Sequence, residues 1–267
     1  MKLAIVKYDS PETNKIEKEL RHLCDEYEIE LNQENPDVVV SIGGDGTFLS
    51  AFQQYSHLLD SIRFLGIHTG HLGFYTDWRE YEVGELVKSL MYEQEESVCY
   101  PILDVEIILK NSKKTIHRLA LNEATLKRVD GTLTCDVFIK GEHFERFRGD
   151  GLCISTPTGS TGYNNSLGGA VIHPSLEVLQ LAEIASINNR VYRSLGSSLI
   201  IAPYEWITLK PLDSDGIRYS IDQENKASDN ISAMRVRIAD QEVHFAKYRH
   251  TPFWIRVKDA FIGDVNN

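Results

Sequence analysis

The sequence predicts a two-part α/β protein, and two observations support this fold class. In the first hundred residues, short apolar runs alternate with segments whose apolar residues recur at helical spacing, which is typical of a parallel sheet covered by helices. After Tyr100-Pro101, many short segments alternate apolar with polar residues, as antiparallel strands do. We therefore expect an α/β domain over residues 1–100, with a helix at 252–267 packing back on it, and a mostly β domain of β-sandwich type over residues 101–251.

The first domain is predicted to hold three strand and helix pairs. We expect strands at 3–6, 37–42 and 63–68. Ser10 and Pro11 have the pattern of a helix start, a cap residue followed by proline at the first helical position. The apolar residues at helical spacing are Ile16, Leu20, Leu23, Cys24 and Tyr27, then Phe48, Ala51, Phe52 and Tyr55, then Val83, Leu86, Val87 and Leu90.

The second domain is predicted to consist mainly of short strands. We expect them at 103–109, 134–140, 151–155, 199–202, 206–210, 217–222, 231–238 and 243–246. Lys140-Gly141-Glu142 fits a hairpin turn between two of them. One helical segment is predicted around 176–184, and Phe253, Val257 and Phe261 return to helical spacing in the tail.

Charge and composition exclude several classes of function. A net charge of −11, with a pI near 5.3, argues against nucleic acid or an anionic membrane as partner, because either needs a basic face. No apolar run is long enough to span a membrane and no signal peptide is visible, so we expect a cytoplasmic protein. The four cysteines are far apart, which indicates free thiols and neither a zinc site nor a disulfide framework.

The stretch from Asp37 to Thr47 holds the first candidate site. An apolar strand ends in Gly43-Gly44-Asp45-Gly46-Thr47, and a helix follows directly. Glycines at such a junction let backbone amides approach a phosphate, so we expect phosphate binding by Gly43, Gly44, Gly46 and Thr47. A carboxylate beside phosphates is repelled unless it binds a metal or accepts a proton, so Asp45 indicates phosphoryl transfer. The alternative is a tight turn in which Asp45 caps the helix.

Two further stretches have unusual polar residues. Asn122-Glu123 lies in an otherwise apolar strand, where a buried acid needs a ligand or partner, unless the segment is a surface turn. Gly149-Asp150-Gly151 and then residues 155–169 are rich in hydroxyls, amides and glycines, with Tyr163 as the one aromatic residue of the longer run. Such a loop suits a flat polar ligand, with a stacking surface at Tyr163. A flexible polar loop without a ligand is the alternative.

Together, residues 43–47, Asn122-Glu123 and residues 156–163 resemble the ordered motif set of bacterial NAD kinases, the ATP/polyphosphate-NAD kinase family, over essentially the whole chain. The resemblance implies a Rossmann-like, phosphofructokinase-like first domain and an NAD-binding second domain. It implies transfer of the γ-phosphoryl group of ATP, another triphosphate or polyphosphate to the 2′-hydroxyl of the adenosine ribose of NAD, with magnesium, to make NADP. It also implies a homotetramer.

The resemblance assigns roles to individual residues, with Asp45 as the catalytic base and no protein ligand for a metal. The NAD-binding residues that it implies are Asp45, Gly46, Asn122, Glu123, Arg148, Asp150, Thr158, Thr161, Gly162, Tyr163, Asn164, Asn165, Ser166, Ala185, Ile187, Asp222 and Gln223. Two positions depart from the family pattern: Gly162 stands where alanine is usual, and Gln223 where several relatives have histidine or glycine.

Two other functions compete with this interpretation. A lipid or sugar kinase of the same superfamily shares the first motif, but the acidic composition and the hydroxyl-rich loop argue against a membrane-bound acceptor. A pyridine-nucleotide sensor without catalysis would gain nothing from Asp45 beside phosphates.

Overall fold

The computed structural model describes residues 1–70, 73–93, 96–110 and 115–263, and it divides into two compact units. Unit 1 comprises residues 1–99 and 242–267, and unit 2 comprises residues 100–241. Residues 71–72, and residues 264–267 of the predicted tail helix, lie outside the described residues. None of the helices in the described ranges is long and apolar enough to cross a membrane.

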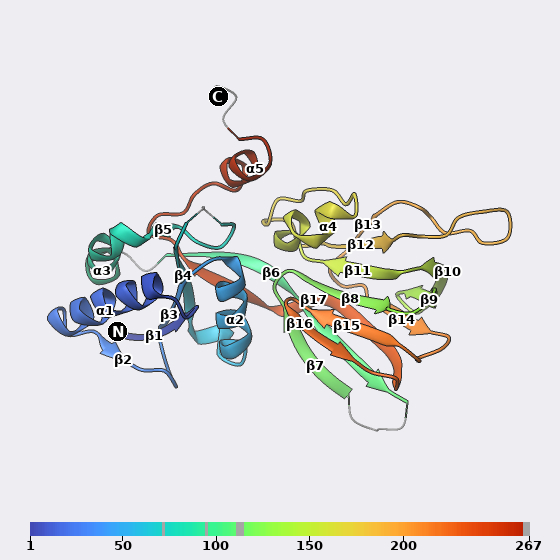
Figure 1. The fold of residues 1–267 in the computed structure, drawn as a ribbon, viewed down its shortest axis with the longest axis horizontal. Helices are drawn as coiled ribbons and strands as arrows, with labels where there is room; N and C mark the ends of the chain where they lie inside the picture. Colours follow the sequence, from blue (N-terminus) through green and yellow to red (C-terminus); the bar gives the residue numbers. More distant parts are fainter. Residues whose placement is uncertain (71–72, 94–95, 111–114, 264–267) are drawn as a thin grey trace. The chain divides into compact units, whose positions relative to one another are not determined.

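Unit 1 is a parallel sheet with helices on both faces (Figure 1). Its elements are β1 (Lys2–Lys7), α1 (Pro11–Glu26), β2 (Glu30–Leu31), β3 (Val38–Ile42), α2 (Asp45–Tyr55), η1 (Leu59–Ser61), β4 (Arg63–His68), β5 (Trp78–Arg79), η2 (Glu80–Glu82), α3 (Val83–Tyr92) and α5 (Phe253–Phe261). The strand order is β4-β3-β1-β2, with β5 and the end of β17 paired to β4. These five strand pairs are parallel, and through β17 the sheet continues into antiparallel strands. The α/β prediction for this part of the chain is confirmed.

The helices of unit 1 follow from local sequence signals. Ser10 accepts a hydrogen bond from the Thr13 backbone N–H at 3.2 Å, and Pro11 follows the cap, so α1 begins as predicted. Apolar residues of α1 and α3 form one cluster with one face of the sheet. On the opposite face, Phe48 and Phe52 of α2 pack on Phe64. β3 lies between β1 and β4 and is buried at all five positions, which explains its continuous apolar run.

Unit 2 is a β-sandwich, as predicted. Its elements are β6 (Ser97–Leu109, whose first residues belong to unit 1), β7 (Thr115–Ala120), β8 (Glu123–Arg128), β9 (Leu133–Ile139), β10 (Glu142–Gly149), β11 (Gly151–Ser155), η3 (Thr158–Thr161), α4 (Tyr163–Ser166), β12 (Leu179–Ile184), β13 (Leu199–Ile201), β14 (Ile207–Pro211), β15 (Ile217–Ile221), β16 (Glu224–Ala227) and β17 (Ile231–Ala246, which ends in unit 1). One sheet has the order β10-β9-β14-β17-β6-β7, and the other β13-β12-β11-β8-β15-β16. Apolar side chains from both sheets form a single core.

One segment of unit 2 was predicted with the wrong type of secondary structure, and the strands predicted separately at 231–238 and 243–246 are the single strand β17. Residues around 176–184 do not form a helix: Leu179–Ile184 is strand β12, paired antiparallel with β11 on one side and β13 on the other. Five of its six residues are buried, because the strand is covered on both faces. A short run buried on both faces shows no alternation, and its apolar spacing therefore also fits a helix.

The hairpin prediction at Lys140-Gly141-Glu142 is confirmed, because β9 and β10 pair antiparallel across that turn. Lys140 and Gly141 both have positive φ, of 54° and 86°. A two-residue turn of this kind matches the twist of the flanking strands, and glycine adopts positive φ without strain.

Candidate functional site

The first group of predicted site residues lies at the carboxyl end of β3, where the chain enters α2. Gly43 has a φ of 152° and its N–H donates to the Ile67 carbonyl oxygen at 2.9 Å. A Cβ at this position would overlap the side chain of Thr47, so the turn requires glycine. Helix α2 starts at Asp45 with Gly44 as its cap residue and no side-chain cap hydrogen bond. This is the type of helix start at which phosphates bind.

Asp45 is half-buried, and two backbone groups hold its carboxylate. The Phe74 N–H donates to Oδ2 at 2.9 Å and the Tyr75 N–H donates to Oδ1 at 3.0 Å. The Cα of Gly73 lies so close that a methyl group there would overlap the carboxylate. Asp45 is therefore not the side-chain cap of α2, since its oxygens accept from a segment about thirty residues away. Each oxygen keeps a lone pair for a further hydrogen bond.

The second group is organised by Asp222, a buried residue directly after β15. Its carboxylate accepts three consecutive backbone N–H bonds, from Leu121 at 3.0 Å, Asn122 at 2.7 Å and Glu123 at 3.3 Å. Its own N–H donates to the Glu123 carbonyl oxygen at 2.9 Å. The carboxylate thus holds the Asn122-Glu123 segment in place. Gln223, the next residue, is exposed.

Glu123 has a carboxyl group in an unusual environment. One of its oxygens, Oε2, is buried and has no hydrogen-bond partner among the described residues. Burial, followed by the negative charge of Asp222, raises the pKa of Glu123 from its usual 4.5 to about 8, against a smaller opposing effect of Lys127. The acid is therefore largely protonated at neutral pH and can donate a hydrogen bond to a ligand.

Residues 156–166 form a compact turn in place of the extended loop that the sequence suggested. They fold into η3 and α4, and most of their hydroxyls point inward. The Thr156 hydroxyl donates to the Leu121 carbonyl oxygen at 2.7 Å, and the Thr161 hydroxyl donates to that of Thr158 at 3.1 Å. The first of these bonds holds the turn against the segment before Asn122, and the second closes the turn on itself.

Gly162, at the join of η3 and α4, faces Asn122 and Glu123 at the start of β8. A Cβ built on Gly162 would lie 3.6 Å from Glu123 Oε2 and 3.9 Å from Asn122 Nδ2. These are ordinary contacts, so the alanine that is usual in the family would fit here. The structure thus brings Asn122, Glu123, Gly162 and Asp222 together, as a binding site needs.

Tyr163 and Asn164 continue this surface. The Lys127 ammonium lies 4.1 Å from the centre of the Tyr163 ring and donates to its hydroxyl oxygen at 2.9 Å. Asn164 is fully buried, and neither polar atom of its amide has a hydrogen-bond partner in the described part of the chain. Of the other predicted residues, Thr158 is buried, Asn165 is half-buried, and Ser166 is exposed and donates to the Tyr163 carbonyl oxygen at 2.9 Å.

Arg148, Asp150, Ala185 and Ile187 form a third group, at the corner between β10 and β11. The Ile187 N–H donates to the Arg148 carbonyl oxygen at 2.7 Å, and the Asp150 N–H donates to that of Ile184 at 2.9 Å. The Arg148 guanidinium stacks on Tyr192, 3.8 Å from the ring centre. Ala185 has a φ of 48°, which is uncommon for a residue with a side chain and often marks a functional segment.

Four groups that contact the predicted site residues were not predicted from the sequence. They are the backbone amides of Phe74 and Tyr75, and the side chains of Lys127 and Tyr192. Backbone donors leave no signal in side-chain identity. Lys127 lies four residues after Glu123 on β8, so alternation could have placed both on one face of the strand. Tyr192 has no comparable signal, because it lies in an irregular segment.

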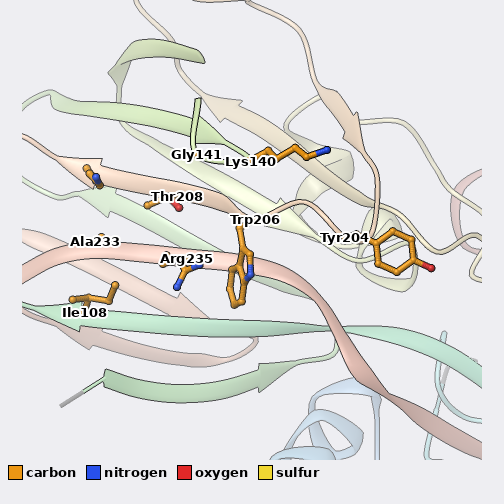
Figure 2. Close-up of a pocket in the computed structure, with 9 residues that line it drawn as sticks. Ile108, Lys140, Gly141, Tyr204, Trp206, Thr208, Ala233 and Arg235 are labelled. Carbon is orange, nitrogen blue, oxygen red and sulfur yellow. The ribbon is translucent and has the colours of Figure 1, made fainter. Parts of the chain in front are cut away.

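A hollow of about 560 Å³ on the outer face of the β9-β14-β17 sheet is a weaker candidate (Figure 2). Its lining residues are Ile108, Lys140, Gly141, Tyr204, Trp206, Thr208, Lys210, Ala233 and Arg235. The cations among them already have partners in the protein. Arg235 pairs with Glu106 at 2.8 Å, Lys140 pairs with Glu205 at 3.5 Å, and Lys210 stacks on Phe138 at 4.5 Å. None of the predicted site residues lines this hollow.

Comparison with known proteins gives consistent results over both units. Family models described as the ATP-NAD kinase N-terminal domain and the ATP-NAD kinase C-terminal domain match residues 7–95 and 121–247. The chain is 54% identical to the NAD kinase of Enterococcus faecalis over 264 residues, which cover 99% of this chain and all of that protein. It is 53% identical to the NAD kinase of Lactobacillus gasseri, with all of both chains covered.

Two solved structures are similar to the whole fold. Yeast NADH kinase complexed with NADH matches with a TM-score of 0.84 at 22% identity, covering 100% of this chain and 89% of that one. An NAD kinase from Archaeoglobus fulgidus in complex with ATP matches with a TM-score of 0.73 at 25% identity, covering 92% of this chain and 94% of that one. At 22% identity, the first likeness establishes the fold.

The raised pKa of Glu123 predicts how stability depends on pH. Between about pH 4.5 and 8, Glu123 keeps its proton in the folded protein but has released it in the unfolded chain. The free energy of unfolding therefore decreases as pH rises through this range. Above about pH 8 the stabilisation that the protonated group contributes is fully lost. Glu123→Gln is neutral at every pH and should flatten this part of the profile. Denaturant unfolding at pH 5 to 9 measures it, with Glu142→Gln, an exposed glutamate of the same unit, as control. A profile unchanged by Glu123→Gln would contradict the assignment.

Tyr163 gives a second prediction. If its ring stacks on a ring of NAD, Tyr163→Ala should weaken NAD binding by roughly 1 to 3 kcal/mol, and Tyr163→Phe should retain most of the affinity. Calorimetric titration with NAD measures both, and Phe144→Ala, at a 43% exposed aromatic residue of the same unit, is the control. Equal losses in the two variants would assign the contact to the hydroxyl and its Lys127 partner, and unchanged binding in both would remove Tyr163 from the site.

Proposed function

Because the chain belongs to the ATP-NAD kinase family and is an NAD kinase, we propose that Asp45 is the base in transfer of the γ-phosphoryl group of ATP to the 2′-hydroxyl of the adenosine ribose of NAD. The observation that carries this proposal is the geometry of Asp45. Two backbone N–H groups fix its carboxylate, at 2.9 and 3.0 Å, beside the start of α2. A fixed carboxylate with lone pairs still open is what removal of a hydroxyl proton requires.

In the proposed step, Asp45 accepts the proton of the 2′-hydroxyl while that oxygen forms its bond to the γ-phosphorus. The bond between the γ-phosphorus and the bridging oxygen breaks, and ADP leaves. Residues 43–47 would bind the triphosphate through backbone amides and the start of α2, which has no side-chain cap to compete with a phosphate. A ribose hydroxyl is a poor nucleophile, so holding it in line with the phosphorus supplies much of the rate.

The surface around Glu123 would bind NAD. Glu123 Oε2, which has no hydrogen-bond partner among the described residues, and the neighbouring side-chain amide of Asn122 would hydrogen-bond the hydroxyls of a ribose or the edge of a base. Tyr163 would supply a stacking surface, and Gly162 the adjoining wall. Around Arg148 and Asp150, the backbone of Ala185 and Ile187 would line the nicotinamide end.

Magnesium is part of the proposal as a companion of the triphosphate. Mg²⁺ usually keeps several waters and binds to substrate phosphates. The triphosphate would hold the ion, whose positive charge would offset that of the phosphates, and the Asp45 carboxylate would remain available as the base.

The proposal also includes a homotetramer in the cytoplasm. Apolar side chains are exposed along residues 187–195, including Val191 at 78% and Leu195 at 47%, and such a patch is typical of a surface that contacts another chain. The thiols of all four cysteines are free, which fits a reducing compartment.

A turnover assay tests the function itself. ATP, magnesium and NAD are supplied, and the product is detected with a dehydrogenase that uses NADP alone. A lipid or sugar kinase would turn over its own acceptor and not NAD, and a sensor would bind NADP without producing it.

Asp45→Asn tests the mechanism. Asparagine keeps the shape of aspartate but cannot accept the proton, so turnover should fall by about 10² to 10⁴ while NAD affinity stays nearly unchanged. Turnover and affinity are measured across a magnesium titration, with Asp25→Asn on the surface of α1 as control. Wild-type turnover would end the catalytic role, and recovery at high magnesium would make Asp45 a metal ligand.

The oligomer gives a separate prediction. Light scattering should find a tetramer, and dilution to monomers should abolish activity, because residues 187–195 would lose their partner surface. Val191→Asp places a charge in this patch and should shift the mass toward smaller species. A fully active monomer would contradict the prediction.

A further inference from the structure

Arg256, on the C-terminal helix α5, is a buried charge that the proposed mechanism does not use. Its residue is only 4% exposed. A guanidinium is always charged, so burying one is costly unless each of its N–H groups finds an acceptor. Its partners therefore indicate what the side chain does.

Arg256 makes its hydrogen bonds to a single neighbouring segment and to the residues before its own helix. Nη1 donates to the carbonyl oxygens of Gly73 at 2.7 Å and Thr76 at 2.8 Å. Nη2 pairs with the Asp77 carboxylate, and Nε donates to the Thr251 carbonyl oxygen at 3.2 Å. The planar guanidinium thus fixes residues 73–77 from both ends, which a flexible point charge could not do.

This segment is the one that holds Asp45. The Phe74 and Tyr75 N–H groups donate to the two oxygens of the carboxylate, and Gly73 lies directly against it. The ring of Phe74 also packs on α5, with ring centres 6.4 Å from Phe253 and 6.1 Å from Phe261. A continuous chain of contacts therefore runs from α5 through residues 73–75 to Asp45, all inside unit 1.

We propose that Arg256 is a positioning residue for catalysis, which fixes residues 73–75 so that their backbone amides orient the Asp45 carboxylate toward the substrate hydroxyl. The inference rests on the proposed role of Asp45 as the base. Arg256 touches neither substrate. Arg256 instead determines how the Asp45 carboxylate, and with it the remaining lone pairs, is oriented. A small misplacement of a reacting group is enough to slow a reaction severely.

The experiment is a double-mutant cycle. Arg256→Lys keeps a cation beside Asp77 but cannot reach both carbonyl oxygens of residues 73 and 76 in the same way. We expect kcat to fall by about 10- to 100-fold with KM for NAD nearly unchanged. In an Asp45→Asn background, the same substitution should cost little more, because a residue that acts through Asp45 has nothing left to position.

Two further variants keep the test decisive. Arg249→Lys is the matched control. Arg249 lies in the same C-terminal region, but its ion-pair partners are Glu82 at 2.6 Å and Glu85 at 2.9 Å and its guanidinium lies over Trp78, so kcat should stay at the wild-type value. Gly73→Ala leaves the Arg256 side chain intact but adds a methyl group against the carboxylate, and it should lower kcat with the same lack of additivity toward Asp45→Asn. If Arg256→Lys fails to fold, Arg256→Gln, which keeps an amide donor for the carbonyl oxygens of Gly73 and Thr76, takes its place in the cycle.

The outcomes separate this inference from the proposed function. A folded Arg256→Lys protein that loses thermal stability but keeps wild-type kcat would overturn the positioning role, even if Asp45→Asn is inactive. Full additivity of the two substitutions would overturn it as well. Wild-type turnover by Asp45→Asn, in contrast, would remove the proposed base itself.

Discussion

The structure of both units depends on one kind of interaction, an aspartate carboxylate that accepts consecutive backbone N–H groups from a distant segment. Asp45 accepts two such bonds and Asp222 accepts three. Bonds from N–H groups to a carboxylate are stronger than those between neutral groups, and they satisfy the backbone groups that donate them. In unit 1 the bonds orient a carboxylate, and in unit 2 they place the Asn122-Glu123 segment. The candidate residues occupy fixed positions because of these contacts.

Most of the fold could be predicted because its signals are local. The cap at Ser10, the apolar run of β3 and the helical spacing of Phe48 to Tyr55 each lie within a dozen residues, and the structure has the expected element at each. Residues 176–184 show where this approach fails. The helix expected there is strand β12, because pairing with β11 and β13 decides its conformation and its short apolar run fits both structures.

The sequence indicates candidate residues for the site but not the contacts that hold them. Glycines and an acid after a strand indicate a phosphate site in any α/β protein, whereas the bonds that fix Asp45 come from backbone atoms of residues 74 and 75. The Asp222 carboxylate and the Leu121 N–H are 101 positions apart in the chain, and Arg256 and Gly73 are 183 apart. Nothing in the local pattern near any of these residues names its partner. The same holds for the hydroxyls of residues 156–161, which the structure turns inward.

The negative charge of the protein bears on how it could bind anionic substrates. With a net charge of −11, further ionised carboxylates at the site would repel a dinucleotide and a triphosphate. Glu123 adds little to this repulsion, because burial and the charge of Asp222 raise its pKa to about 8 and leave its carboxyl group mostly neutral at pH 7. The negative charge of Asp222 is stabilised by hydrogen bonds from three backbone N–H groups. Asp45, in unit 1, has two N–H bonds and remaining lone pairs, so the three acids differ in environment as the roles proposed for them require, those of a hydrogen-bond donor, a structural acceptor and a base.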